Sequence, residues 1–345
     1  MTLHWIKEEA HKLGFFACGA AEAKPVDADV AAHFKAWVAQ EKQADMHYMG
    51  NYLEKRLDPC RLVPGTKTIL SLAMNYAPAQ LMSEEEYRLA AYAYGKDYHD
   101  LMKSRLRILA SLIQAEFEAL DKQTEAISSS FTDDKDSDDT PPPRIAVFVD
   151  TAPVLERYWA QKAGIGWIGR NHQLIIPRAG SMFFLGEIFL PFALDTYDRP
   201  MSNRCGKCRR CIAACPVGAI GTSPYFESHK CLSYQLIENR NALSSEAIET
   251  MGNMIYGCDR CQTACPWNQF ATPTNEPDLQ PRPDLLAMKK ADWHNLSIEH
   301  YRELFRGSAV KRAKYDGLMR NIHAAELAQT DKSDIEEAKR NPIQQ

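Results

Sequence analysis

Two short runs of cysteine carry the clearest chemistry in this sequence of 345 residues. The first, CGKCRRCIAACP (205–216), has the spacing C-x2-C-x2-C-x3-C-P, and YGCDRCQTACP (256–266) repeats its last three cysteines. The second run has no first cysteine, because Ile255 stands at the corresponding position. In this pattern three thiolates bind one [4Fe–4S] cluster and the fourth binds its neighbour. The runs therefore predict a ferredoxin-like pair of clusters and supply seven of the eight ligands.

The eighth ligand must come from one of the three remaining cysteines. Cys18 lies among small apolar residues, as an inert buried thiol would, and Cys60 lies in a turn beside a proline far upstream. Cys231 lies between the two runs, so we assign it as the eighth ligand. Exchange of the fourth cysteines gives two sets of ligands, namely Cys205, Cys208, Cys211 and Cys265 for one cluster, and Cys215, Cys231, Cys258 and Cys261 for the other.

Structural zinc is the alternative, because C-x2-C pairs are common zinc ligands. Zinc gives no reason for two C-x3-C-P endings, whereas paired clusters require them. The N-terminal residues are charged and contain no apolar signal segment, so we expect a cytoplasmic protein whose many cysteines are explained by metal binding and not by disulfides. The longest apolar run, SMFFLGEIFLPFAL, is interrupted by Glu187 and Pro191, so we expect no membrane-spanning segment.

The remaining sequence predicts a mixed α/β (α/β or α+β) protein in three parts. We expect a layered α/β domain over residues 1–200, the cluster module over 201–275 and a basic, mostly helical tail over 276–345. Hydrophobic periodicity and turn residues predict the elements of the first domain. Helices are expected over 2–13, 29–43, 97–120 and 151–164, and strands over 67–78, 144–150, 172–177 and 182–190.

An acidic segment, DKQTEAISSSFTDDKDSDDTPPP (121–143), interrupts this pattern. It carries a formal charge of −5, so the rest of the chain is +1 although the total is −4. Its composition cannot bury apolar surface, and we expect a disordered loop that lies away from any polyanionic partner.

Asp150 is the main candidate for acid–base chemistry. It ends the strand RIAVFVD, at the carboxyl edge where α/β sheets collect ligands. The alternative is a carboxylate that only satisfies backbone N–H groups at the start of a helix, for which Thr151 is a candidate cap and Pro153 lies in the first turn. The alternatives predict opposite shifts, because helix-end amides lower the pKa of a carboxyl group and burial against an apolar cofactor raises it.

Other signals are weaker. His47 in DMHYMG matches a cobalt-ligand pattern but follows a helical segment, so a helix end on the surface is the favoured interpretation. GIGWIG (164–169) follows a helix, so it predicts a tight turn and close backbone approach to a flat ligand instead of a dinucleotide site. His99 in DYHD is either a base or a ligand, or a capping or packing residue, which is the commoner role of a single histidine near a helix start. The basic segment 301–321 is either a solvated surface or a contact for a phosphate backbone.

The chain resembles the epoxyqueuosine reductases, which use cobalamin and two [4Fe–4S] clusters in the last step of making the tRNA nucleoside queuosine. The resemblance extends from the N-terminus to about residue 325. It is carried by RLDPCRLVPGTKTIL, YGKDYHDLMKSRL, FVDTAPVLER, KAGIGWIGRN, GSMFFLGEI, CGKCRRCIAACPVGAI, KCLSYQ, GNMIYGCDRCQTACPWN and GSAVKRAKYDGLMRN.

This resemblance implies roles for particular residues. Asp150 would be the proton donor at the cobalamin, Cys231 falls where the family keeps its displaced ligand, and His47 would be a chance match because the family holds its corrinoid without a protein imidazole on cobalt. The contacts to cobalamin would come from Arg56, Asp150, Asn171, Leu174, Leu185 and Ser233. The 276–345 tail would be a truncated form of the HEAT-like helices that often extend this family.

The implied reaction is the two-electron reduction of the epoxide of epoxyqueuosine in tRNA. An external low-potential donor would supply the electrons, and the enzyme would be a monomer. Two other functions remain open. A reductive dehalogenase shares the cofactors but typically has a twin-arginine signal, and Arg209–Arg210 lies within a cluster loop. A ferredoxin-type electron carrier would leave the α/β domain without a function.

Overall fold

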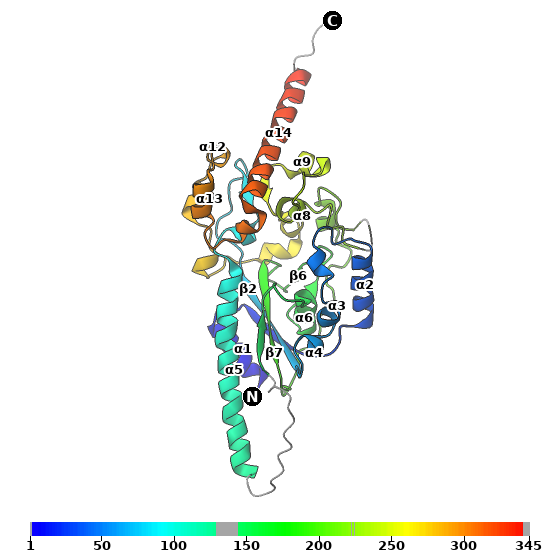
Figure 1. The fold of residues 1–345 in the computed structure, drawn as a ribbon, viewed down its shortest axis with the longest axis vertical. Coiled ribbons are helices and arrows are strands. Elements are labelled where there is room, and N and C mark those ends of the chain that lie inside the picture. Colours follow the sequence, from blue (N-terminus) through cyan, green and yellow to red (C-terminus); the bar gives the residue numbers. More distant parts are fainter. Residues whose placement is uncertain (1, 129–143, 222, 224, 341–345) are drawn as a thin grey trace.

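The first part of the chain is built around a four-stranded sheet (Figure 1). A computed structural model describes residues 2–128, 144–221, 223 and 225–340. The strands lie in the order β1-β2-β7-β4, and every neighbouring pair is antiparallel. Their bounds are β1 Ala17–Glu22, β2 Thr68–Asn75, β4 Ala146–Phe148 and β7 Phe183–Leu190.

Helices cover both faces of this sheet (Figure 1). Helices α1 and α5 contact one face, and α6 contacts the other. The apolar residues of β2 therefore point both ways: Leu70, Leu72 and Met74 pack in the core that includes α5, and Ile69 packs with Trp159 of α6. The helices of this part are α1 Leu3–Lys12, α2 Ala28–Ala39, α3 Leu53–Leu57, α4 Pro59–Leu62, α5 Tyr98–Ser128 and α6 Glu156–Lys162, with 3-10 turns η1 His47–Met49 and η2 Ala91–Ala93.

Several sequence predictions for this domain are confirmed and others are wrong. The helices at 2–13 and 29–43 and the strands at 67–78 and 182–190 are present with small changes of bounds. The helix expected at 151–164 begins only at Glu156, because Asp150 adopts a positive φ of 54° and the chain bends through Pro153 before the helix starts. The strand expected at 172–177 is only β6 (Leu174–Ile175), which pairs with β5 (Trp167–Ile168).

The long helix and the antiparallel sheet change two further expectations. Helix α5 continues to Ser128, so residues 121–128 of the expected disordered loop are helical, and 129–143 lie outside the described residues. The continuous backbone hydrogen bonding of a long helix outweighs the acidic composition there. Asp150 also does not lie at a common carboxyl edge, because an antiparallel sheet has none.

The cysteine-rich part consists of short helices and one short strand. These elements are α7 Arg210–Ala213, α8 Leu232–Ile237, α9 Ser245–Met251, β8 Met254–Tyr256, α10 Arg260–Thr263 and η3 Pro266–Phe270. Strand β8 pairs in parallel with β3 (Arg88–Leu89), which lies before α5 in the chain. The pairing brings the chain between β2 and α5 against the cysteine-rich part.

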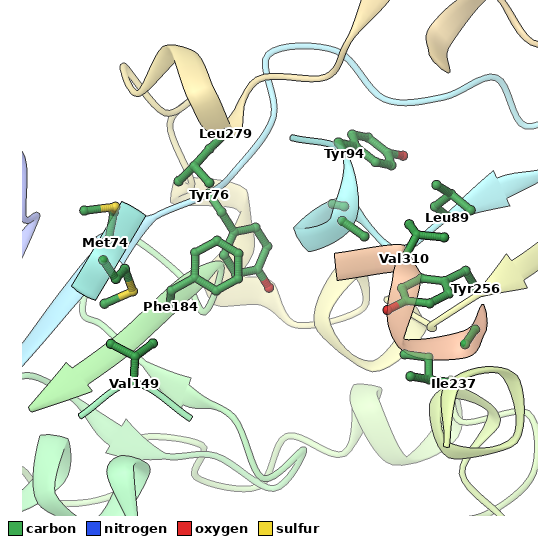
Figure 2. Close-up of a cluster of buried hydrophobic side chains, with 14 of the residues drawn as sticks. Met74, Tyr76, Leu89, Tyr94, Val149, Phe184, Ile237, Tyr256, Leu279 and Val310 are labelled. Carbon is green, nitrogen blue, oxygen red and sulfur yellow. The ribbon is translucent and has the colours of Figure 1, made fainter. Parts of the chain in front are cut away.

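The tail is helical and packs against the cysteine-rich part. Its elements are η4 Pro277–Leu279, α11 Pro283–Ala287, α12 Lys290–His294, α13 Ile298–Leu304, η5 Ala309–Ala313 and α14 Lys314–Arg340. One continuous apolar core joins all three parts, and Figure 2 shows Met74 and Phe184 of the sheet in the same view as Tyr256 of β8 and Val310 of the tail. Across the described residues, no helix has both the length and the apolar character needed to cross a membrane.

Candidate functional site

The first set of predicted ligands surrounds one cavity. Cys205 and Cys208 come from the loop before α7, Cys211 from α7 itself and Cys265 from the link between α10 and η3. The two helices pack against each other, which brings thiols from distant sequence positions together. The rest of the cavity lining is Arg170, Asn171, Ile175, Pro266 and Trp267.

The second set of predicted ligands also lies together. Burial raises the pKa of the Cys261 thiol to about 12, and the neighbouring thiols of Cys258, Cys231 and Cys215 raise it further. Cys231 is the residue before α8, and although burial raises its pKa, the backbone N–H groups of Tyr234 and Ser233 act in the opposite direction. Backbone donors at a helix start stabilise a thiolate, so this position suits a cluster ligand.

The first set has the arrangement that a four-iron cluster requires. In the described parts of the chain, no three His, Cys, Asp or Glu side chains are arranged to hold one metal ion. The first set instead surrounds a cavity with one thiol from a distant run, as the ferredoxin spacing requires. Cys18 and Cys60 lie outside both sets, Cys18 in β1 and Cys60 in α4, where its Sγ lies 3.3 Å from the carbonyl oxygen of Thr66.

Asp150 lies in an exposed bend between β4 and α6, and its side chain is held from two sides. The hydroxyl of Tyr98 donates to its Oδ2 at 2.7 Å, and Nε2 of His99 lies 3.5 Å from the same oxygen. The hydrogen bond with His99 lowers the pKa of Asp150, burial raises it and the bond from Tyr98 lowers it, with a net lowering. The pKa of Asp150 is thus lowered, as predicted for a carboxylate that accepts hydrogen bonds. The donors are side chains of α5, however, and not backbone amides at a helix start.

Two more carboxyl groups lie behind Asp150. Glu156, the first residue of α6, accepts a hydrogen bond from the backbone N–H of Asp150 at 2.5 Å. Burial raises the pKa of Glu156 to about 8, and the charge of Asp150 adds to this shift. Glu187 of β7 is fully buried, and burial followed by Glu156 and Asp150 raises its pKa well above the usual range. Burial and the neighbouring carboxyl groups therefore favour the protonated form of both Glu156 and Glu187.

The sequence favoured a capping or packing role for His99 and did not predict that Tyr98 and His99 contact Asp150. His99 is not simply a capping or packing residue, because its Nδ1 lies 2.7 Å from Oδ1 of Asp97 while its Nε2 faces Asp150. The three consecutive polar residues Asp97, Tyr98 and His99 could have indicated a polar site. Their partner Asp150, however, lies 51 positions after His99 in the sequence. Only the packing of α5 against β4 and β7 brings them together.

The residues that the resemblance implies as cobalamin contacts come from four elements and one loop. Arg56 of α3 is buried, and among the described residues its Nε is a buried donor that has no hydrogen-bond partner. Burial lowers the pKa of Arg56, and nearby Tyr48 and Glu156 oppose this. An unused buried donor near Glu156 suits the binding of a polar group of a ligand.

The other four residues differ in exposure. Asn171 is buried in the loop between β5 and β6, and Leu174 of β6 and Leu185 of β7 pack in one apolar cluster. Ser233 of α8 is half-buried, two residues after Cys231. Two aliphatic side chains, two polar groups and an unused guanidinium nitrogen are suited to a large ligand that is apolar at its centre and polar at its rim.

A direct contact links this region to the second thiol set. Nδ2 of Asn171 donates to the backbone oxygen of Cys261 at 3.4 Å. The hydroxyl of Tyr76 donates to Gln262, the next residue, at 3.1 Å, and the ring of Tyr76 packs on that of Phe184 (Figure 2). Asn171 and Tyr76 therefore pack against the segment that carries Cys261.

The weaker sequence signals have structural explanations. GIGWIG forms the tight turn after α6, with Gly164 at φ 70°. A Cβ on Gly166 would lie 2.2 Å from the carbonyl oxygen of Ile175, so the close approach at this glycine is made by the chain itself. His47 is exposed in η1. In the basic segment, Arg320 donates to backbone oxygens of Gln235, Asn239 and Asn241, so this arginine has a structural role.

Comparisons with known proteins agree with this arrangement. Residues 204–268 match the model of a 4Fe-4S double cluster binding domain, and residues 56–130 match that of epoxyqueuosine reductase QueG, DUF1730. The epoxyqueuosine reductase of Cellulophaga algicola is 38% identical over 92% of this chain and 95% of its own length. That of Escherichia coli is 36% identical over 93% of this chain and 79% of its own length.

Solved structures show the same fold. The epoxyqueuosine reductase of Streptococcus thermophilus has a TM-score of 0.75 at 25% identity, over 99% of this chain and 87% of that one. Another epoxyqueuosine reductase, solved with an epoxyqueuosine-modified tRNA-Tyr stem loop, has a TM-score of 0.75 at 24% identity, over 99% of this chain and 86% of that one. The double-cluster module, the mixed α/β fold and the identity to relatives over nearly their whole length have one explanation: this chain belongs to the epoxyqueuosine reductase family.

Proposed function

We propose that this protein reduces epoxyqueuosine to queuosine in the wobble position of tRNA. The observation that carries this proposal is the identity of 38% to an epoxyqueuosine reductase over 92% of the chain. The geometry supports it independently, because it combines an acid site with two sets of four thiols.

The reaction determines what the site must supply. Converting an epoxide to an alkene breaks both bonds from carbon to the epoxide oxygen and releases that oxygen as water. The conversion consumes two electrons and two protons. A [4Fe–4S] cluster passes one electron at a time, so two neighbouring clusters provide a route for the electrons from a low-potential donor.

We assign eight cysteines as the cluster ligands. The first cluster would be held by the set around the cavity and the second by the set that includes Cys231. Because the C-x3-C-P cysteine of each run binds the cluster of the other run, the clusters are neighbours. In domain terms, residues 201–275 form the ferredoxin-like module beside a cobalamin-binding domain at 1–200.

Arg56, Asn171, Leu174, Leu185 and Ser233 would hold a cobalamin, which when bound supplies a strongly reducing metal centre that can attack carbon. The unused Nε of Arg56 would donate to a polar group at the rim of the corrin. Leu174 and Leu185 would exclude water from its face. Asn171, which contacts the backbone of Cys261 and lines the cavity of the first thiol set, would supply a polar contact on the side of the cluster module.

Asp150 would deliver a proton to the epoxide oxygen as its bond to carbon breaks. An alkoxide is a poor leaving group in the absence of an acid, and a positioned acid contributes about 10²–10⁴-fold to such a step. The bond from Tyr98 orients Asp150, and the bond from its own N–H to Glu156 holds the bend.

The tRNA would contact the basic residues of the tail. Arg302, Arg306, Lys311 and Lys314 are exposed, in contrast to Arg320, which binds backbone oxygens. We assign the reaction to a monomeric enzyme in the cytoplasm. Binding through phosphate contacts predicts that tRNA affinity falls steeply as salt rises.

An anaerobic turnover assay tests the proposal. Purified protein with reconstituted clusters is given a chemical reductant and epoxyqueuosine-containing tRNA, with and without added cobalamin. Mass spectrometry of the digested tRNA should show queuosine only with cobalamin. Cobalamin binding and full iron content with no queuosine formed would favour a different substrate, and absence of cobalamin binding would favour an electron carrier.

A further inference from the structure

We propose that His99 supplies the proton that Asp150 delivers, so that the two side chains act as one acid held in place by Asp97. This inference rests on the proposed function for the identity of the substrate. The arrangement of the three side chains is independent of the substrate.

The geometry is that of a relay with a fixed direction. Nδ1 of His99 lies 2.7 Å from Oδ1 of Asp97, and Nε2 lies 3.5 Å from Oδ2 of Asp150. Oδ1 of Asp97 also accepts the backbone N–H of His99 at 3.0 Å, so the imidazole and its partner are fixed to the same helix start. A hydrogen on Nδ1 stays with Asp97, which leaves the Nε2 hydrogen as the one that can move.

Orientation of Asp150 does not require His99. The hydroxyl of Tyr98 already donates to Oδ2 of Asp150 at 2.7 Å, and the carboxyl group of Glu156 accepts the backbone N–H of Asp150. Burial and the charge of Asp150 raise the pKa of Tyr98, so this hydroxyl remains a neutral donor and does not give up its proton. His99 is thus the neighbour that can both hold and release a proton near neutral pH.

The charges around the pair favour a proton on His99. Hydrogen bonds to Asp150 and then to Asp97 raise the pKa of His99 to about 9 against the effect of burial, while the bond with His99 lowers that of Asp150. The other groups that face the pair are Tyr98 and Lys103 of α5, Glu156 and Arg157 of α6, Glu187 of β7 and Tyr48 of η1. At pH 7 the resting pair is therefore an imidazolium and a carboxylate, and Asp150 alone has no proton to give.

The proton balance of the step is simple. Nε2 of His99 gives its proton to the carboxylate of Asp150, and Asp150 gives a proton to the epoxide oxygen as a bond from carbon to that oxygen breaks, so Asp150 ends again as a carboxylate. His99 is left neutral with its hydrogen on Nδ1, and water reprotonates Nε2. One of the two protons of the reaction passes by this route, and the electrons are those of the established two-electron reduction.

The test compares His99→Gln with the wild-type holoenzyme. Glutamine retains an amide donor towards Asp150 but has no proton to transfer, so a purely orienting role would survive the change. We expect at least a tenfold loss of turnover at pH 7.5, with recovery towards pH 5, because Asp150 without its imidazolium neighbour holds its own proton at acidic pH. The wild type should lose activity as the pH rises through about 9. His300→Gln on exposed α13 is the matched control and should match the wild type.

A second measurement does not depend on turnover. The His99 resonances of isotope-labelled protein, assigned by their loss in His99→Gln, should titrate near pH 9, and Asp150→Asn or Asp97→Asn should lower this midpoint. A wild-type pH profile in His99→Gln, or a His99 midpoint near the ordinary value of about 6.5, would overturn the relay. If no tRNA is turned over, the titration still decides the inference, and the proposed function fails separately.

Discussion

The ring of Tyr98 stacks on that of Phe184 with centroids 3.9 Å apart and planes 4° from parallel. Tyr98 donates to Asp150, while Phe184 packs on Tyr76, whose hydroxyl donates to Gln262 beside Cys261. The acid and a predicted cluster ligand are therefore joined by side chains in direct contact. A change at Tyr98 can be designed to alter the acid while leaving this packing in place.

Tyr98→Phe should lower turnover about tenfold or more while the clusters and the fold remain intact. The change removes the donor to Oδ2 of Asp150 but retains the ring that stacks on Phe184, and a hydrogen bond to a charged group contributes about 1.5–3 kcal/mol. Initial rates with saturating tRNA measure the effect. Tyr315→Phe, which removes a hydroxyl that donates to the Leu296 carbonyl oxygen in the tail, is the control. Equal rates for Tyr98→Phe and Tyr315→Phe would show that the hydroxyl of Tyr98 is not needed to orient Asp150.

Glu156→Gln should make the stability of the protein less sensitive to pH. The unfolded chain ionises Glu156 near its ordinary pKa, whereas the folded protein holds the proton until about pH 8. The unfolded state therefore binds fewer protons between these values, and the free energy of unfolding falls as the pH rises through this window. Glutamine does not ionise, so this fall in the free energy of unfolding disappears, and its side-chain oxygen can still accept the N–H of Asp150. Urea unfolding at pH 5, 6.5 and 8 should show that the free energy of unfolding falls less steeply with pH in the variant than in the wild type. Equal slopes would contradict a raised pKa of Glu156 in the folded protein.

Cys231→Ala should lower the iron content by about half, because one of two four-iron clusters loses a ligand. Iron and sulfide analysis after anaerobic reconstitution measures this, and electron paramagnetic resonance should retain the signal of one cluster. Cys60→Ala, which changes a thiol outside both sets, is the control and should retain all the iron. Full iron in Cys231→Ala would mean that another residue completes the second cluster.

The cysteine spacing and the order of motifs in the sequence predict much of this site. The spacing in each run is a local property, so both thiol sets follow from the sequence, and Cys231 follows from its position between the runs. His99 could not be predicted in the same way, because its partner is 51 residues away and meets it only through packing of α5 on the sheet. Glu156 and Glu187 also gain their raised pKa values from burial that no local pattern shows.

The errors in secondary structure have a similar origin. Thr151 and Pro153 are typical of a helix start, but the positive φ of Asp150 directs the chain into a bend and α6 begins later. A non-glycine residue with positive φ is strained and often marks a functional position. The residue with this backbone conformation here is Asp150, the proposed proton donor.

The most direct test of the account is single-turnover reduction of epoxyqueuosine tRNA by Asp150→Ala, with iron and cobalamin contents matched to the wild type. We expect full loading with both cofactors and a rate of queuosine formation lowered by about 10²-fold or more, because only the acid is missing. Queuosine formed at the wild-type rate would contradict it, since the proton would then reach the epoxide oxygen without Asp150.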